Sequence, residues 1–255
     1  MQDLWDFREL VYFLAWRDIK VRYKQTAFGL LWAVMQPLFT MAIFTIFFAR
    51  MAKIPTDGIP GPIFYFSALV PWIYFSTTVS NAGMSLVSNS TLLTKIYFPR
   101  IILPAAAALG TVVDFFVSSL LLIGIMVYYG VPVGSSLLLW GLLLVLLMLL
   151  ALGLGTFFAA LNVRYRDVKY ALPFFIQLLL FVTPIIYPTS LVPERYRWLL
   201  SFNPLGALIE SFRRVAARES LDWHALGISV LITVTVLIAS VVYFRSTEKA
   251  MADLV

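Results

Sequence analysis

The sequence contains no cysteine, a single histidine and few charged residues for its length. Without cysteine, the chain can form no disulfide framework and no thiolate metal site, and it has no cysteine nucleophile. Charged residues make up 13% of the 255 residues, whereas soluble domains carry about 25%. Hydrophobic residues make up 61%, and the mean hydropathy is +0.90. The composition therefore predicts an integral membrane protein.

The motifs of several enzyme classes are also missing. There is no His-Glu-x-x-His, Gly-x-Ser-x-Gly or Asp-x-Asp pattern, so a membrane enzyme such as a glycosyltransferase or intramembrane protease would lack its acid, base and metal groups. A Gly-x-x-x-x-Gly-Lys-Ser/Thr phosphate loop is absent too, so any energy from ATP has to come through a partner. The net charge of +6 does not indicate nucleic-acid binding, because the cations lie in loops between apolar runs and form no basic face.

Long uncharged runs predict an all-α integral membrane protein in which residues 1–255 form a single transmembrane domain. A helix rises about 1.5 Å per residue, so runs of about 20 residues can cross a hydrocarbon core of about 30 Å. In the fourth run, Ala151, Gly155 and Ala159 form a small-residue face suited to close helix packing. The six predicted spans cover about 28–49, 63–88, 100–129, 137–161, 170–187 and 225–244.

The segments outside the spans predict the orientation. Residues 1–27 place apolar residues at helical spacing among charges and Trp or Tyr rings, which predicts an interfacial amphipathic helix on the cytoplasmic surface. Residues 188–223 interleave charged and apolar residues and predict an external re-entrant helical hairpin. Cations concentrate in the first segment, in the loops after the second and fourth spans, and in the tail 245–255. The positive-inside rule therefore places both termini in the cytoplasm, although the cations in 188–223 run against it.

The loop at 92–100 is the most central short segment of the chain. Lys95 and Arg100 are the only ionised side chains between positions 58 and 108, and three large apolar residues lie between them. Such residues are unusual in a solvent-facing loop that has no partner. Because the loop joins two stiff helices, it can pass a push from a soluble partner into the membrane. We therefore predict that it is the transmission point of a transporter.

Four segments, taken in order, resemble the membrane subunit of ABC exporters for polysaccharides. This family contains the O-antigen, capsule and teichoic-acid permeases of the type-2 ABC exporter superfamily. The resemblance covers nearly the whole chain and is closest to the O-antigen permeases. The matching segments are 17–24 (RDIKVRYK) with 28–32 (FGLLW) and 36–38 (QPL), the loop 95–104, 162–168 (NVRYRDV), and 202–213.

The resemblance implies the partners and the location of the protein. It implies a homodimer in the bacterial cytoplasmic (inner) membrane that works with two copies of a separate ABC ATPase subunit. ATP and Mg would then bind to that ATPase, with no cofactor, no metal site and no catalytic residue on this chain. The implied cargo is a polysaccharide carried on undecaprenyl diphosphate. Membrane lipid is the further expected partner, and nucleic acid is not one.

Within this family, the loop at 92–100 would be a coupling helix seated in a groove of the ATPase, with apolar anchors and a charged rim. The alternative is an ordinary topogenic loop with interfacial aromatic residues. The candidate coupling residues are Lys95, Ile96, Tyr97, Phe98 and Arg100.

Cations at the cytoplasmic side are candidates for gathering the lipid diphosphate at its entrance, since the planar fork of arginine can bond two phosphate oxygens at once. The alternative is plain positive-inside topology with contact to anionic lipid. The candidates are Arg17, Lys20, Arg22, Lys24, Arg164, Arg166 and Lys169.

Aromatic residues are dense in the predicted spans. The flat C–H patches of a sugar polymer can slide over ring faces, so some of these rings are candidates for lining a channel. The alternative is that they fill lipid-facing and interface positions. The candidates are Trp32, Phe39, Trp72, Tyr74, Phe75, Phe174, Phe181 and Tyr187.

Asp114 is the one acid within a predicted span. Leaving it ionised in the membrane would cost about 2.5 to 3.5 kcal/mol, so it should face the bundle. We expect it to bond a hydroxyl, an amide such as Gln177, or a cation of the external hairpin. A proton-coupled role is the alternative, although a single isolated acid makes a poor relay.

Charged residues of the hairpin at 188–223 are candidates for an external gate beneath the exit, by resemblance to the family. Their alternative role is interfacial anchoring by snorkelling cations. The gate candidates are Glu194, Arg195, Arg197, Glu210, Arg213 and Arg214.

Other transport functions stay open from the residues alone. An ABC exporter of capsule, teichoic acid or a small molecule would share this topology, while the segments 95–104 and 162–167 favour polysaccharide. A secondary transporter or channel is a weaker alternative, because such proteins usually show internal repeats or several intramembrane charges. The sequence shows no clear repeat.

Overall fold

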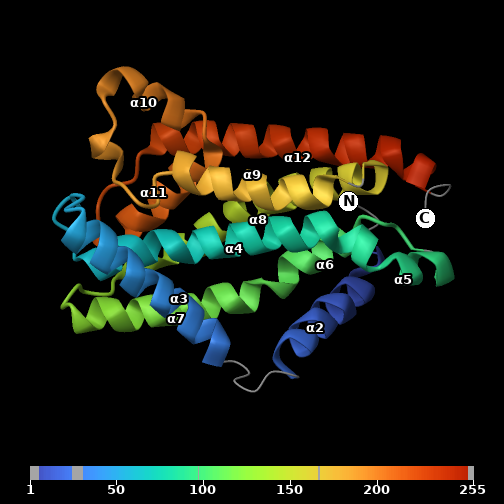
Figure 1. The fold of residues 1–255 in the computed structure, drawn as a ribbon, viewed down its shortest axis with the longest axis horizontal. Coiled ribbons are helices and arrows are strands. Elements are labelled where there is room, and N and C mark those ends of the chain that lie inside the picture. The colour runs from blue at the N-terminus through green and yellow to red at the C-terminus, as the bar shows by residue number, and fades with distance from the viewer. Residues whose placement is uncertain (1–5, 25–30, 97, 166, 252–255) are drawn as a thin grey trace.

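The computed structural model describes residues 6–24, 31–96, 98–165 and 167–251, and this part of the chain is helical without any strand (Figure 1). Short helical turns at Thr45–Met51, Ser135–Leu137 and Thr189–Leu191 flank the longer elements. The α-helices are α2 (Arg8–Lys24), α3 (Leu31–Phe44), α4 (Gly61–Ser88), α5 (Ser90–Lys95), α6 (Ile102–Gly110), α7 (Val112–Tyr128), α8 (Leu138–Arg164), α9 (Val168–Val182), α10 (Glu194–Ser201), α11 (Pro204–Ala217) and α12 (Trp223–Met251).

Five helices in the described ranges are long and apolar enough to cross a membrane, so the chain is a multi-pass membrane protein. They coincide with the first four predicted spans and the last one. The predicted fifth span corresponds to α9, whose 15 residues would extend only about 22 Å at about 1.5 Å per residue. The five spanning helices are Leu31–Met51, Gly61–Ser88, Ile102–Tyr128, Leu138–Arg164 and Trp223–Glu248.

Helix α4 runs through the middle of the bundle and is buried on nearly all sides (Figure 1). It packs against α8, and the small face predicted on α8 lies in this contact. Ala151, Gly155 and Ala159 are all buried, and a Cβ placed on Gly155 would lie 2.5 Å from the Cβ of Ala82 in α4. The prediction of close packing through small residues is therefore confirmed.

The third span is broken into α6 and α7 at Thr111. The Thr111 hydroxyl donates to the carbonyl oxygen of Ala108 (3.0 Å) and lies 2.6 Å from the hydroxyl of Thr78 in α4. These contacts satisfy a buried polar side chain at the break. The break turns α6 out of the line of α7 (Figure 1), and α6 packs against both α2 and α4.

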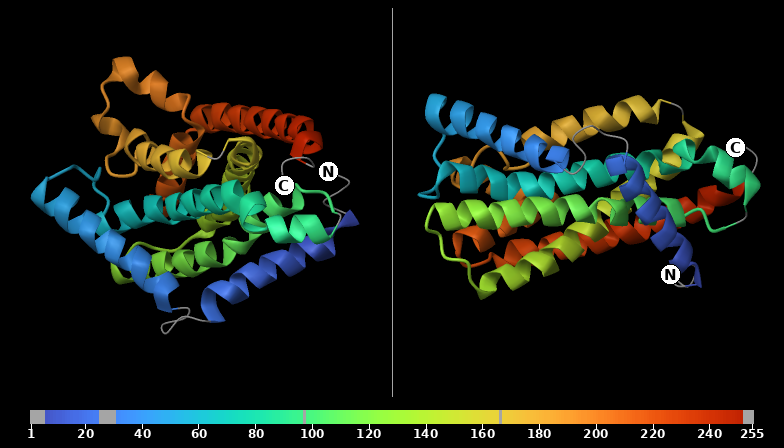
Figure 2. Two further views of the ribbon diagram at one scale, coloured as in Figure 1. Left: turned by 45° about the vertical axis from the view of Figure 1, so that its right-hand side comes forward. Right: turned by 90° about the horizontal axis from the view of Figure 1, so that it is seen from below.

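The two ends of the bundle carry different elements. Helices α10 and α11 lie at one end, together with the connection between α3 and α4 (Figure 1). Helix α5 and the C-terminal end of α12 lie at the other end, where the Arg100 backbone N–H donates to Glu248 Oε1 at 3.3 Å. Further views show that α2 runs obliquely beside the bundle while the longer helices follow its length (Figure 2).

Candidate functional site beside the N-terminal helix

Helix α2 is held to the bundle by one apolar face. Its Val11, Leu14 and Ala15 are buried in a cluster with Phe98 and Leu103. The opposite face leaves large side chains exposed, Tyr12 at 69% and Phe13 at 65%. Helix α2 thus has one face that packs on the protein and another that is free of it.

The C-terminal turn of α2 binds the acid of the third span. Arg22 donates through Nη1 to Asp114 Oδ2, and the Tyr23 hydroxyl donates to Asp114 Oδ1. The side chains of Arg22 and Asp114 are 31% and 23% exposed. Of the expected partners of Asp114, a hydroxyl is confirmed. The expectation of a cation from the external hairpin is wrong, because α2 lies against the break of the third span and supplies Arg22 instead.

Two cavities with several polar side chains in their walls meet at Arg22. The larger, about 500 Å³, lies between α2, α4 and α6 and is lined by Arg17, Arg22, Asn81 and Asn89 among others. The smaller, about 260 Å³, lies between the end of α2, α3, α4 and α7. It includes Gln36, Thr77, Asn81, Asp114 and Ser118 together with Arg22, Tyr23 and Trp32. Arg22 and Asn81 therefore belong to both cavity walls.

Arg17 has partners of its own in the larger cavity. Its guanidinium donates to Asp18 Oδ1 (2.8 Å) and to Asn89 Oδ1 (3.1 Å). Lys20 and Lys24 line a separate hollow of about 320 Å³ with Phe13 and Trp16. The structure thus gathers all four predicted cations of α2 around adjoining hollows, two of them in ion pairs.

The other predicted entrance cations lie on the connection from α8 to α9. Arg164 lies 5.4 Å from the centre of the Tyr165 ring, and Lys169 lies 4.8 Å from that of Tyr170. Both cations are exposed, and these contacts are cation–π pairs of the surface type. Arg166 lies outside the described residues.

The residues of the predicted coupling loop differ in how far they are buried. Lys95 is exposed at the end of α5, and Ile96 is 56% exposed, whereas Phe98 is only 5% exposed. Phe98 packs in the cluster beneath α2, so the structure does not place it as a surface anchor. Arg100 is half-buried, and its Nη1 has no hydrogen-bond partner. Tyr97 lies outside the described residues.

The predicted channel aromatics fall into two groups. Trp72, Tyr74 and Phe75 are buried in the core of α4, where the Tyr74 hydroxyl donates to the carbonyl oxygen of Ala108 at 3.3 Å. A ring inside the packed core of the chain cannot contact a sliding polymer, so these three do not line a channel in this conformation. Tyr187 is half-buried. The rings that are exposed on the helix surfaces are Trp32, Phe39, Phe174 and Phe181.

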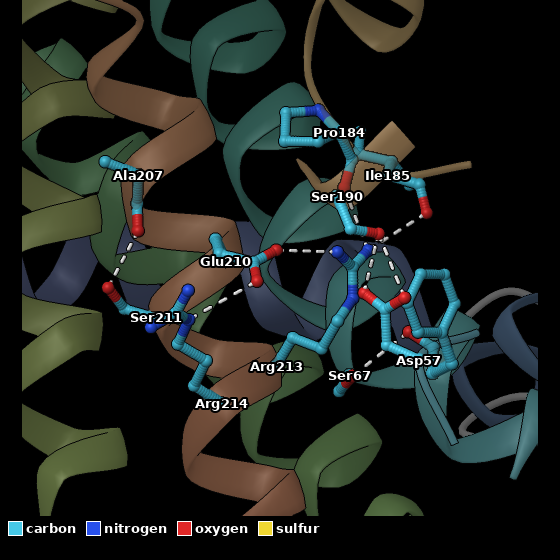
Figure 3. Close-up of polar contacts among 11 residues, drawn as sticks. Asp57, Ser67, Pro184, Ile185, Ser190, Ala207, Glu210, Ser211, Arg213 and Arg214 are labelled. Carbon is cyan, nitrogen blue, oxygen red and sulfur yellow. Dashed lines mark hydrogen bonds and ion pairs between the residues drawn. The ribbon is translucent and has the colours of Figure 1, made fainter. Parts of the chain in front are cut away.

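The charged residues near the other end surround Arg213 (Figure 3). This arginine is 3% exposed and donates to Glu210 Oε2 (2.8 Å) and to the carbonyl oxygens of Pro184 (2.8 Å) and Ile185 (3.2 Å). Its guanidinium also lies 3.9 Å from the centre of the Phe64 ring. Arg213 therefore joins α11 to the turn after α9 and to α4, as a buried cation that is both paired and hydrogen-bonded.

The remaining gate candidates lie toward the surface. Glu194, Arg195 and Arg197 are exposed on α10, and Glu194 pairs with Arg197 at 3.6 Å. Arg214 contacts Glu210 at 3.4 Å and is half-exposed. A hollow of about 390 Å³ lies among these elements. Only Arg213 of this group is fixed deep inside the protein.

Sequence reasoning missed several polar residues of the two sites. Tyr23 carried only an interfacial signal, while Asn81 and Asn89 stood in an uncharged run without any motif. Asp57, in the connection before α4, accepts a hydrogen bond from the Ser190 hydroxyl at 2.9 Å (Figure 3). A signal existed for Asn81, since an amide within a span prefers a polar partner.

The bundle of long apolar helices defines the class of the chain as a multi-pass membrane protein. The family model of the ABC-2 type transporter matches residues 9–216, so the chain belongs to this family of transporter membrane proteins. The match includes both sites described above, because it extends from α2 to α11.

The chain is similar along its length to named permeases. It is 26% identical over 240 residues to the O-antigen export system permease protein RfbA of Klebsiella pneumoniae, covering 93% of this chain and 92% of that protein. It is 27% identical over 257 residues to RfbA of Myxococcus xanthus, covering 99% and 98%. It is 24% identical over 241 residues to the polysialic acid transport protein KpsM of Escherichia coli, covering 92% of both.

Proposed function

We propose that this chain is the membrane subunit of an ATP-driven exporter that moves a lipid-linked polysaccharide, of the O-antigen kind, across the bacterial inner membrane. The observation that carries the proposal is the family match over residues 9–216, together with likeness to O-antigen export permeases over more than nine-tenths of the chain. The chain is not itself the ATPase in this proposal, since its sequence lacks the phosphate loop. ATP and Mg act on two copies of a separate subunit.

The coupling role falls on the end of the bundle that carries α5. Ile96 exposes an apolar side chain beside the cation of Lys95, a combination suited to an apolar pocket with a charged rim. Phe98 and Arg100 lie behind them, and the Arg100 backbone contacts Glu248 of α12. A push on the loop would therefore reach α6 and α12 directly.

The membrane arrangement completes the proposal. Helix α9 forms a short fifth span, which brings the number of spans to six and places both termini in the cytoplasm. Helix α2 lies in the cytoplasmic interface. Helices α10 and α11 form the re-entrant hairpin on the outer side, where Glu194, Arg195 and Arg197 of α10 act in the external gate. Two copies of the chain form the channel. The exposed rings of Trp32, Phe39, Phe174 and Phe181 are the candidates to line it or the subunit interface.

Capsule polysaccharide is the second candidate cargo. The likeness to polysialic acid transport proteins, at 24% identity over 241 residues, favours it. The identity to the O-antigen permeases is similar in size, at 26% and 27%. The two candidates share the fold, the partner and the energy source and differ only in the polymer.

Co-purification with the ATPase encoded beside this chain tests the proposal. We expect a stable complex whose ATP turnover falls several-fold when Ile96 is replaced by alanine, because an exposed apolar anchor at an interface contributes about 1 to 2 kcal/mol. Val87→Ala is the matched control, because it shortens a 44% exposed apolar residue at the end of α4, just before the loop. A chain that binds no ATPase would refute the proposal and favour a secondary transporter.

A further inference from the structure

We propose that Asp114 is a displaceable counter-ion of Arg22, and that an anionic diphosphate group entering the cavity beside α2 takes its place. The inference rests on the proposed function, because that function brings a lipid-linked diphosphate to this side of the membrane. It gives Asp114 a functional role beyond pairing α2 with the third span. The ligand is defined by its chemistry, a group with two linked phosphates.

Arg22 and Tyr23 form an anion-binding site that the Asp114 carboxylate of the same chain already occupies. Arg22 and Tyr23 are adjacent residues, and each donates to a different oxygen of the same carboxylate. A phosphate presents oxygens to the same two donors and carries more negative charge, and a guanidinium pairs with either a carboxylate or a phosphate. Asp114 is thus an internal stand-in for the ligand that these donors suit.

The site can be reached and can accommodate the displaced acid. Arg22 keeps 31% of its side chain exposed and Asp114 keeps 23%, and the cavities of about 500 and 260 Å³ meet at Arg22. Once released, Asp114 would remain beside Gln36, Thr77 and Ser118, which line the smaller cavity and can donate hydrogen bonds to it. The exchange therefore leaves neither charge buried without partners.

The exchange would also loosen α2 from α7. Arg22 and Asp114 are 92 residues apart and join α2 to α7. In contrast, the pair of Arg17 and Asp18 lies within α2 itself, so breaking that pair leaves the placement of the helices unchanged. Occupation of the site by a diphosphate would release the end of α2 from the third span.

Binding of farnesyl diphosphate to the full chain in phosphatidylcholine nanodiscs tests the inference. Asp114 competes with the ligand for Arg22, so the apparent affinity is reduced in proportion to the fraction of molecules in which Arg22 is free. With that fraction at about one-tenth, Asp114→Asn should tighten binding by about tenfold. Arg22→Gln should weaken binding by about tenfold, the scale of a lost charged hydrogen bond. Adding Asp114→Asn to Arg22→Gln should then give no gain.

Glu9→Gln is the matched control, because Glu9 is an exposed acid in the first turn of α2 and its loss changes the net charge equally. It should leave the affinity unchanged. If folded Asp114→Asn protein binds the diphosphate no more tightly than the wild-type chain does, the inference is overturned. If that variant does not fold, Asp114→Ser also removes the carboxylate while keeping a hydroxyl that can accept from Tyr23, and it should tighten binding by a similar factor. No gain in that variant either would also overturn it.

Further arms of the titration identify the source of the phosphate. A similar gain with inorganic pyrophosphate supports a site that reads the diphosphate alone. A gain seen only with phosphatidylglycerol in the nanodisc would overturn the assignment in favour of a phospholipid headgroup. Co-purification with the ATPase is measured in parallel on the same variants. If the ATPase complex forms but Asp114→Asn does not bind the diphosphate more tightly, only the counter-ion role is rejected. If the wild-type chain forms no complex with the ATPase, the proposed function is rejected.

Discussion

Substituting alanine for Gly155 is expected to destabilise the protein, because this glycine lies where α8 packs directly on α4. A Cβ at Gly155 would stand 2.5 Å from the Cβ of Ala82, whereas carbon atoms in contact prefer about 3.5 to 4.0 Å. Both atoms belong to helical segments that can relieve the overlap only by moving apart. Overpacking of this kind costs about 1 to 3 kcal/mol.

Gly141→Ala is the matched control on the same helix, because a Cβ at that position meets nothing within 4 Å. Both substitutions gain the helix preference of alanine over glycine, about 1 kcal/mol, so their difference isolates the clash. We expect Gly155→Ala to be less stable than Gly141→Ala by about 1 to 3 kcal/mol. The measurement is the free energy of unfolding of the full chain in detergent micelles, titrated with SDS.

A second substitution tests the cause of the effect. Ala82→Gly in the Gly155→Ala background removes the clashing atom and leaves the Cα of residue 82 at 3.7 Å, an ordinary contact distance. Measured against Ala82→Gly alone, which carries the helix cost of glycine of about 1 kcal/mol, Gly155→Ala should then lose little stability. Equal stability of Gly155→Ala and Gly141→Ala, or an undiminished loss in the Ala82→Gly background, would refute the packing argument.

Two further predictions concern buried polar groups. Arg213→Gln removes the cation that binds one carboxylate and two backbone carbonyls and should cost about 3 to 5 kcal/mol of stability. The same change at the half-exposed neighbour Arg214 should cost less than about 1 kcal/mol of stability. Similar losses of stability from both substitutions in thermal unfolding would contradict the role given to Arg213. Thr111→Val keeps the shape but leaves the Thr78 hydroxyl without its 2.6 Å partner, which should cost about 1 to 3 kcal/mol. Thr235→Val, on an exposed position of α12, should be close to neutral, and a Thr111→Val protein as stable as that control would speak against the bridge.

The faces of the helices were harder to predict than the helices themselves. Trp72, Tyr74 and Phe75 are buried in the core, whereas Trp32 and Phe39 are exposed, although the helix that carries the buried rings is the less apolar of the two. Lipid and protein core are both apolar, so hydropathy does not distinguish a lipid-facing side from a packed one. Only the position of α4 between its neighbours decides which rings are enclosed.

The partners in the candidate site also depend on non-local distances. Asp114 was correctly predicted to need a partner, since an unpaired charge in a span is costly. Its partner Arg22 lies 92 positions away, and the sequence indicates this arginine only as an entrance cation. The break at Thr111 carries α6 toward α2, and no local pattern in the sequence indicates that turn.

The sequence by itself determined that this chain is a multi-pass helical membrane protein, and five of its six predicted spans coincide with helices that are long and apolar enough to cross a membrane. It could do so because the free energy of inserting a helix is largely a sum over the residues of that helix. The tertiary structure alone decided that Phe98 is buried, that Arg213 joins three elements, and that Arg22 meets Asp114 between two cavities. Such contacts depend on where distant helices pack, so they cannot be read from the residues of one helix.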